Sequence, residues 1–270
     1  YVIVKSADAT EAESFAVSEL SSYLKRITGA DFSIVDDKTP VPSPAIYVGN
    51  TSFARKNGAD SAKLAPEEWI VKKVGKDLIL NGGHPRGTLY GVYDFLENYA
   101  GCRWYDLVTT KVPSNPNLTL PDSLDVHRRP FFRLRSLYWV NAIRPEYSLW
   151  AVRNHFNSLI AHSAKYGFRE PFGSPGFAHT YYEYSRNFPD ECFSMNASGK
   201  RIRAQNPSGP GQLCLSNPLT LKLCTEKLLN YIRSDREKAG KAKEPAPVYY
   251  MFFANDNSSF CQCPECRRAV

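Results

Sequence analysis

Residues 10–29 read TEAESFAVSELSSYLKRITG and follow the alternating YVIVK of residues 1–5, and these two stretches decide the fold of the first part of the chain. Thr10 and Glu13 have the spacing of a capping box, in which each side chain accepts a hydrogen bond from the other residue's backbone N–H. Apolar side chains then recur every three or four residues, and Gly29 stands where a left-handed C-cap belongs. The pattern predicts a strand followed by an amphipathic helix.

Four further runs, each bounded by Pro, Gly or Asp, are short and apolar or alternating, which is typical of strands. They are Phe32–Val35, Ala45–Gly49, Trp69–Lys73 and Asp77–Asn81. A second helix is expected to begin near Arg86 and to stop at Gly101. The order of strand, helix, strands and helix predicts a small α+β domain over residues 1–125, with a mixed sheet that carries its helices on one face.

The pattern changes after a proline-rich segment at 112–130, which we expect to be a linker. Beyond it, strands are expected at Phe132–Trp139, Phe156–His162 and Val248–Ala254, and helices at Glu146–Asn154 and Pro218–Glu237. This α/β alternation predicts that residues 126–270 are the first half of a (β/α)8 TIM-type barrel, truncated because a complete barrel needs roughly 250 residues. A smaller α/β domain is the alternative.

The composition is that of a globular protein, with 270 residues of which 43% are hydrophobic and 23% charged. The 34 basic and 27 acidic residues give a net charge of +7, but the basic residues are scattered, so nucleic acid is not an expected partner. No apolar run approaches about 18 residues, so no transmembrane segment is expected, and the first residues do not resemble a signal peptide.

G-x-S-x-G and H-E-x-x-H are both absent from the sequence, which leaves serine hydrolase and zincin functions unsupported. The oligomeric state is not predicted.

The densest polar group in the sequence is Asn255-Asp256-Asn257, directly after the apolar run at 248–254. Ligands of parallel α/β sheets and barrels bind at the carboxyl ends of strands, so Asp256 is the best catalytic candidate. An Asx turn or a helix cap formed by these residues is the alternative.

Three thiols lie within six residues in Cys261-Gln-Cys263-Pro-Glu-Cys266. A structural zinc site needs four ligands, and the fourth could be Cys214 or a histidine. Two alternatives remain: two of the three cysteines form a disulfide and the third is a free thiol, or all three are reduced thiols. A catalytic metal is less favoured, because thiolate-rich sites are usually structural.

His179 lies in the long, Gly- and Pro-rich stretch between His162 and Leu213, which is too long for a plain connection and is expected to be functional. A histidine there could bind a polar ligand or transfer a proton, although a structural histidine is the commoner case. Aromatic residues, among them Tyr138 and Tyr181, stand near the expected strand ends. Such rings suit a carbohydrate ligand, although most aromatic residues in any protein belong to the core.

Several stretches together resemble known families. Leu24–Ala30, Ala45–Gly49, Pro85–Glu97 and Gly101–Tyr105 closely resemble the non-catalytic domain that precedes the barrel in family 20 hexosaminidases and α-glucuronidases. Gln212–Pro218, Asn255-Asp256 and the three clustered cysteines resemble the barrel of proteins that carry the domain of unknown function 4838, a grouping that includes the family 163 endo-β-N-acetylglucosaminidases.

The resemblance implies a secreted, periplasmic or cell-surface glycoside hydrolase, typical of gut Bacteroidetes, that acts on N-acetylglucosamine-containing glycans and needs no cofactor for catalysis. In substrate-assisted retention the sugar's own acetamide oxygen attacks the anomeric carbon, so the enzyme supplies an acetamide holder and an acid. By the resemblance, Asn255 would orient the acetamide and Asp256 would act as acid or polariser, although family 20 has an Asp-Glu pair there. His179, Tyr138 and Arg135 would contact substrate. A non-catalytic carbohydrate-binding protein is the alternative.

Overall fold

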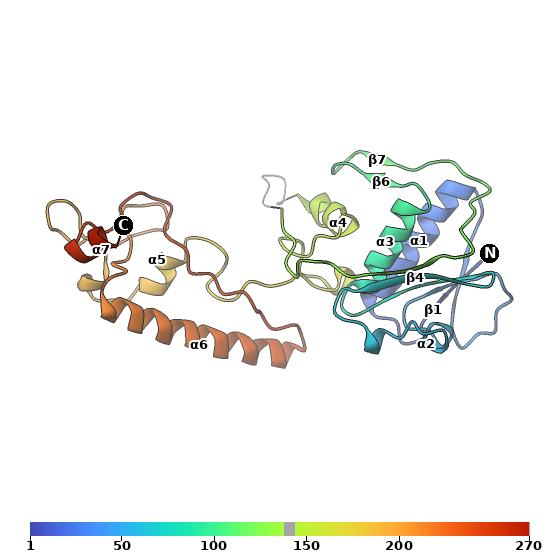
Figure 1. Ribbon diagram of the computed structural model, residues 1–270, viewed down its shortest axis with the longest axis horizontal. Helices are drawn as coiled ribbons and strands as arrows, with labels where there is room; N and C mark the ends of the chain where they lie inside the picture. Colours follow the sequence, from blue (N-terminus) through green and yellow to red (C-terminus); the bar gives the residue numbers. More distant parts are fainter. Residues whose placement is uncertain (138–143, 270) are drawn as a thin grey trace. The chain divides into compact units, whose positions relative to one another are not determined.

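The computed structural model describes residues 1–137 and 144–269 (Figure 1). The chain forms two compact units, Tyr1–Arg169 and Glu170–Val270. Within the described residues, no helix combines the length and the apolar character that crossing a bilayer requires.

The first unit is built on a mixed six-stranded sheet with the order β2-β1-β3-β5-β4-β8. The strands are β1 (Val2–Lys5), β2 (Ser33–Asp36), β3 (Ala45–Val48), β4 (Trp69–Val74), β5 (Asp77–Gly82) and β8 (Asp125–Arg128). Strands β2, β1, β3 and β5 run parallel, whereas β4 is antiparallel to both β5 and β8. The mixed sheet and five of its strands agree with the sequence prediction.

Helix α1 (Glu11–Thr28) begins and ends where the sequence predicts. Thr10 and Glu13 form the reciprocal capping box, and Gly29 closes the helix in the left-handed region at φ 76°. Helix α3 (Gly87–Asn98) lies beside α1, and both cover one face of the sheet (Figure 1). The buried faces of both helices belong to one apolar cluster that also contains Leu78 and Leu80 of the sheet.

The expectation that all helices lie on one face is only partly right. The short helix α2 (Ser52–Lys56) lies over the opposite face, where Ala54 packs with Ile70 and Ile79. Because side chains alternate along a strand, Ile79 points away from its neighbours Leu78 and Leu80. The sheet therefore has a large apolar face under α1 and α3 and a smaller one under α2.

The first unit extends well beyond residue 125. Strand β8 lies inside the expected linker and pairs with β4. Helix α4 (Pro145–Arg153) contributes Tyr147, Ala151 and Val152 to the buried cluster that contains α1 and α3. The first unit therefore continues to Arg169, because these apolar side chains are buried with its helices. Two short strands, β6 (Arg103–Trp104) and β7 (Thr110–Lys111), form a separate pair.

The second unit contains the helices α5 (Thr180–Ser185), α6 (Pro218–Ala242) and α7 (Pro264–Arg268). Its small core is a buried cluster around Tyr181, Phe193 and Leu213. Helix α6 matches the predicted helix and continues five residues beyond it.

The predicted first half of a barrel is not confirmed. Of the strands expected after residue 130, none forms a ladder within the described residues, and the second part of Phe132–Trp139 lies outside them. The part of the chain that the structure describes has three isolated bridges instead, one of them the parallel pair Phe172 and Tyr249. A short apolar run becomes a strand only if a neighbouring strand supplies its backbone partners, and the sequence pattern does not show whether one does.

Candidate functional site

Asn255 is buried at the centre of a hydrogen-bond network in the second unit. Its side-chain oxygen accepts a hydrogen bond from the backbone N–H of Tyr182 at 2.9 Å, and its side-chain nitrogen donates to the carbonyl of Gly211 at 3.0 Å. Its own N–H donates to Oε1 of Gln212 at 2.9 Å, and its carbonyl accepts from Nε2 of the same glutamine at 2.8 Å. Asn255 thus joins three segments that are distant in sequence.

Asn257 completes this network on the other side of Asp256. Its side-chain amide donates to the carbonyl of Gly209, and its side-chain oxygen accepts from the N–H of Ser259. The carbonyl of Asn257 also accepts from Nε2 of Gln212 at 2.9 Å. Two buried amides and one half-buried amide therefore fix the backbone on both sides of one exposed residue.

Asp256 is that exposed residue. Its backbone N–H donates to the carbonyl of Pro207 at 2.9 Å. Its carboxylate has no hydrogen bond or ion pair to any residue that the structure describes. The Asx-turn alternative therefore fits Asn257, whose side-chain oxygen accepts from the N–H two residues on. Asp256 is a free carboxylate on a fixed backbone.

The predicted contact His179 lies on a segment that is docked against the chain leading to Asp256. It adopts a left-handed backbone at φ 52° directly before α5. The hydroxyl of Thr180 donates to the carbonyl of Met251 and accepts from the N–H of Phe253. The N–H of Tyr181 donates to the carbonyl of Phe253 at 2.9 Å. His179 is thereby held on the segment that lies along residues 251–255.

Tyr181 is a core residue rather than an open contact surface. Its ring packs on Phe252 with centroids 4.5 Å apart, and burial raises the pKa of its phenol above the ordinary value. The exposed rings nearby in sequence are Phe252, Phe253 and Phe260, each at least 44% exposed. Aromatic side chains at this level of exposure can stack on the apolar face of a ligand.

A cavity of about 420 Å³ lies directly beyond Asp256 in the second unit. Its wall includes Ser258, Ser259 and Phe260, together with Met195 and Asn196. Asp256 itself is two residues from this wall and is not part of it. The cavity combines hydroxyl groups with an exposed ring, which suits a polar ligand that has flat faces.

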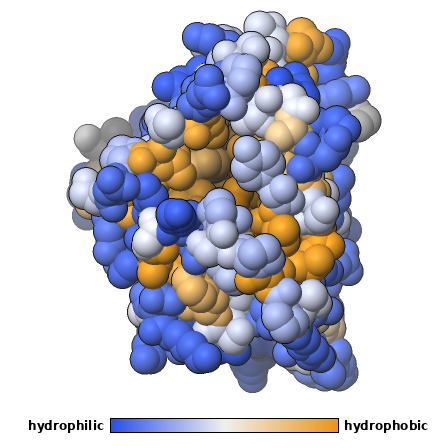
Figure 2. Space-filling model, turned by 90° about the vertical axis from the view of Figure 1, so that its right-hand side faces the viewer, coloured by the Kyte–Doolittle hydropathy of each residue, from blue (hydrophilic) through white to orange (hydrophobic). Residues whose placement is uncertain are grey.

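A second cavity, in the first unit, has a different character. It has a volume of about 210 Å³ and a mainly apolar lining that includes Leu24, Phe32 and Phe95, with Lys76 as its one charged residue. Apolar side chains also gather around a hollow on the face drawn in Figure 2. This cavity lacks the several convergent polar groups that fix the orientation of a ligand in a typical binding site.

Arg135 lies in the first unit, where internal partners occupy its guanidinium. It donates to Oε2 of Glu67 at 2.6 Å and to the carbonyls of His155 and Phe132, both at 2.6 Å. It also lies over the ring of Tyr90. Tyr138, the other predicted contact from this region, lies outside the described residues.

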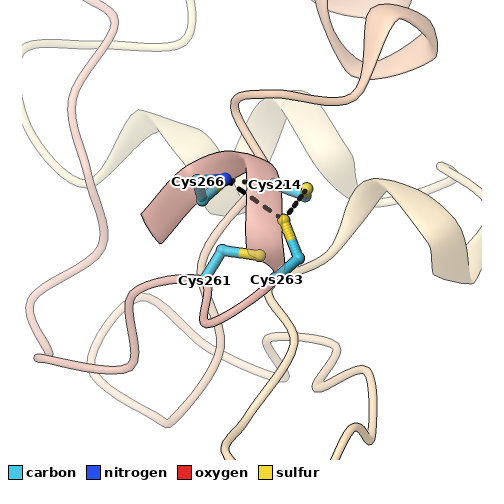
Figure 3. A group of neighbouring side chains, drawn as sticks. All are labelled: Cys214, Cys261, Cys263 and Cys266. Atoms are coloured by element: carbon cyan, nitrogen blue, oxygen red, sulfur yellow. Dashed lines mark hydrogen bonds between the residues drawn. The ribbon is translucent and has the colours of Figure 1, made fainter. Parts of the chain in front are cut away.

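The four cysteines that the sequence singled out meet in one place (Figure 3). The Sγ atoms of Cys214, Cys261, Cys263 and Cys266 all lie within 4.8 Å of one another. The distance from Cys214 is 3.8 Å to Cys263 and 3.9 Å to Cys266. Of the two possible fourth ligands, Cys214 is therefore the one that the fold brings to the other three, and the cluster can hold a structural metal ion.

The polar surroundings of the sulfurs shift their protonation. Hydrogen bonding to the hydroxyl of Ser216, aided by the N–H of Cys266, lowers the pKa of Cys263 to about 6. Burial raises the pKa of Cys261 to about 12. Burial would also raise the pKa of Cys214, but hydrogen bonds with Ser216 and Arg201 outweigh it and the pKa is lowered.

Sequence reasoning did not assign a role to Gln212 or Ser216. Gln212 is 1% exposed and fixes both Asn255 and Asn257, and Ser216 lies beside three of the sulfurs. Both belong to Gln212–Pro218, a stretch whose sequence indicates only a family resemblance. The one available signal is that Gln212 lies two residues before Cys214. A glutamine this close to a cysteine is too common in proteins to predict a role by itself.

A family model, described as a domain of unknown function (DUF4838), matches residues 104–270 of the chain. This range is more than half of the chain, and it contains the Asp256 loop and all four clustered cysteines. The comparison with curated proteins gave no match.

Three solved structures have partial similarity to the chain. A GH115 4-O-methyl-α-glucuronidase with specificity for decorated arabinogalactans is 15% identical, with a TM-score of 0.49 over 62% of this chain and 28% of its own. A GH138 enzyme targeting pectin rhamnogalacturonan II is 16% identical, with a TM-score of 0.37 over 58% and 18%. A mutant β-hexosaminidase of Streptomyces plicatus in complex with the product GlcNAc is 12% identical, with a TM-score of 0.40 over 82% and 50%. The chain thus spans at most half the length of these proteins, and likeness at this level does not define an activity.

Proposed function

We propose that this chain, which belongs to the DUF4838 family, is a glycoside hydrolase that acts on N-acetylglucosamine-containing glycans. One observation carries the proposal: the carboxylate of Asp256 is unpartnered among the described residues, on a backbone that buried amides fix from both sides. A catalytic group needs this combination, because its position must be fixed while its reactive atoms stay accessible.

The cavity next to Asp256 supports a sugar as the ligand. Ser258 and Ser259 offer hydroxyl groups, and Phe260 offers an exposed ring. A pyranose presents hydroxyl groups at its rim and C–H groups on its face, so hydrogen bonds and stacking can act on it together. We propose that His179 contacts the same ligand, because its segment is hydrogen bonded to residues 251–255.

In the proposed reaction the substrate's acetamide oxygen attacks the anomeric carbon while Asp256 protonates the departing glycosidic oxygen or polarises the acetamide. Protonation of the departing oxygen is general acid catalysis, and it requires the carboxyl group to lie within hydrogen-bond reach of that oxygen.

The finer assignments belong to the same proposal. These are endo cleavage of β-linked N-acetylglucosamine, a retaining outcome, a secreted, periplasmic or cell-surface location, and a barrel formed by residues 126–270. The parallel bridge between Phe172 and Tyr249 fits a barrel, whose strands all run parallel.

A second candidate function is carbohydrate binding without hydrolysis, and the placement of Asn255 favours it. Both polar atoms of the Asn255 side chain already have backbone partners. Because this side chain is also only 5% exposed, an acetamide holder from elsewhere would suit substrate assistance better.

Hydrolysis of N-glycans and of aryl β-N-acetylglucosaminides by the full-length protein tests the proposal. Asp256→Asn is expected to reduce kcat by at least about 100-fold, since general acid catalysis contributes about 10²–10⁴-fold. The matched control is Asp190→Asn, an exposed aspartate of the same unit that is paired with Arg203, and it is expected to be as active as the wild type. Unchanged turnover in Asp256→Asn would remove Asp256 as a catalytic group, and glycan binding without any turnover would favour the second candidate.

A further inference from the structure

We infer that Cys214, Cys261, Cys263 and Cys266 bind one Zn²⁺ ion as a structural tetrathiolate that fixes the two ends of the Asp256 site. The inference is independent of the proposed glycosidase activity. It begins with distances: four sulfurs at about 2.3 Å from a tetrahedral zinc ion lie about 3.8 Å from one another. The observed separations of 3.8 Å and 3.9 Å between Cys214 and two of its neighbours agree with that edge length.

A disulfide does not account for this arrangement. It would bring two sulfurs to about 2.05 Å and would leave the other two without a reason to converge. All four cysteines are free, and their sulfurs lie within 4.8 Å of one another. Such mutual proximity of four sulfurs, contributed by two stretches nearly fifty residues apart in sequence, is what a shared metal ion requires.

The surroundings of the sulfurs suit a negatively charged metal centre. The N–H of Met195 donates to Sγ of Cys261 at 3.3 Å, and the N–H of Cys266 donates to Sγ of Cys263 at 3.4 Å. Arg201 donates to Sγ of Cys261 at 3.8 Å and brings a positive charge. Four thiolates and Zn²⁺ carry a net charge of −2, and N–H donors and a nearby cation offset it.

Ser216 is the outer partner shared by most of the ligands. Its Oγ lies 3.5 Å from the sulfur of Cys214, 3.4 Å from that of Cys263 and 3.1 Å from that of Cys266. Partners of this kind orient the ligands of a metal and typically account for 10–100-fold in affinity. We therefore assign Ser216 as the residue that tunes the site.

The position of the centre gives it a structural role. Cys214 follows Gln212 by two residues, and Cys261 follows Asp256 by five. Gln212 is the residue that holds Asn255 and Asn257. A metal ion bound to both segments closes the loop between them, and four sulfurs leave no open position for water or substrate. The centre therefore acts as a clamp on the Asp256 site and takes no part in the chemistry.

Metal content of the untagged, full-length protein, purified under reducing conditions, tests the inference. We expect one zinc per chain in the wild type and in Cys224→Ser, a matched control because Cys224 is a buried thiol outside the cluster. Cys263→Ser is expected to lose zinc, with a fall in affinity of at least 100-fold. Equal zinc in the two variants, or a wild type without zinc after incubation with Zn²⁺, would overturn the inference.

Two further measurements test the metal site even if the Cys263→Ser variant does not fold. Replacing the metal of the wild type with Co²⁺ is expected to give the intense thiolate-to-cobalt charge-transfer bands of a tetrahedral sulfur site. Ser216→Ala keeps all four sulfurs and is expected to bind zinc 10–100-fold more weakly than the wild type. An octahedral cobalt spectrum, or a wild-type mass that is lower by two hydrogen atoms because a disulfide has formed, would contradict the inference.

Discussion

Glu67 shows at the residue scale how the first unit holds the chain that follows its sheet. It is buried, and it accepts hydrogen bonds from Arg86, Arg135 and Asn157. Arg86 also donates to the carbonyls of Gly167 and Phe168. One carboxylate thus connects two arginines and, through them, segments that are about eighty residues apart in sequence.

We predict that Glu67→Gln destabilises the first unit by about 3–5 kcal/mol, because removing one partner of a buried ion pair leaves uncompensated buried charge. Urea unfolding followed by tryptophan fluorescence measures this directly, since all four tryptophans lie within residues 1–169. The control is Asp31→Asn, which removes an exposed ion pair with Lys25 and should cost no more than about 1 kcal/mol. Equal midpoints for the two variants would refute the role of Glu67.

His155 provides a pH-dependent test in the same unit. It is stacked on Trp69, with ring centroids 5.2 Å apart, and burial lowers its pKa even though a hydrogen bond with the carbonyl of Tyr90 opposes the shift. The unfolded chain therefore takes up the proton first, near pH 6.5, so folding stability should fall as the pH decreases below that value.

The variant His155→Asn removes this titration, and asparagine tolerates the left-handed backbone at this position. It is expected to be less stable than the wild type at pH 7, because it loses the stacked ring. Its stability should nevertheless fall less steeply than that of the wild type between about pH 6.5 and pH 5. Parallel stability curves for the two proteins would show that His155 does not contribute to the pH dependence.

At the scale of elements, the segment 251–257 depends on side-chain amides, since it has no strand ladder. Asn255→Ala would remove the acceptor of the Tyr182 N–H and would leave the carbonyl of Gly211 with only the 3.4 Å hydrogen bond from Asn257. An unsatisfied buried polar group costs about 1–3 kcal/mol. We predict at least about tenfold faster hydrogen exchange at the Tyr182 amide. Asp256→Asn, one residue away and exposed, should leave that rate unchanged. Equal exchange in both variants would mean that Asn255 does not hold the segment.

Prediction from sequence succeeded for elements with local signals. The capping box at Thr10 and the C-cap at Gly29 define α1 by hydrogen bonds within a few residues. Helix α6 likewise has Asn217 as its N-cap and Pro218 in its first turn. The strands expected after residue 130 had no comparable signal, because a strand depends on partners that lie far away in sequence.

At the scale of the whole molecule, the division into units was the harder inference. The proline-rich segment that suggested a linker contains β8, and α4 is buried against the first sheet. Amino-acid composition shows where a chain becomes rich in proline, but it does not show against which sheet the neighbouring apolar side chains are buried. The same limit applies to the candidate sites. The four cysteines and Asp256 can be chosen from the sequence by residue type, whereas the role of Gln212 is visible only in the hydrogen bonds that the fold creates.

A map of where a glycan binds tests the proposed function most directly. Amide NMR spectra of the isotope-labelled protein, titrated with β-linked N-acetylglucosamine oligosaccharides, would report on every segment at once. We predict saturable shifts at residues 179–182 and 255–260, with weaker binding in Asp256→Asn than in Asp190→Asn. Shifts confined to the apolar cavity of the first unit, or no shift with any of these glycans, would contradict it.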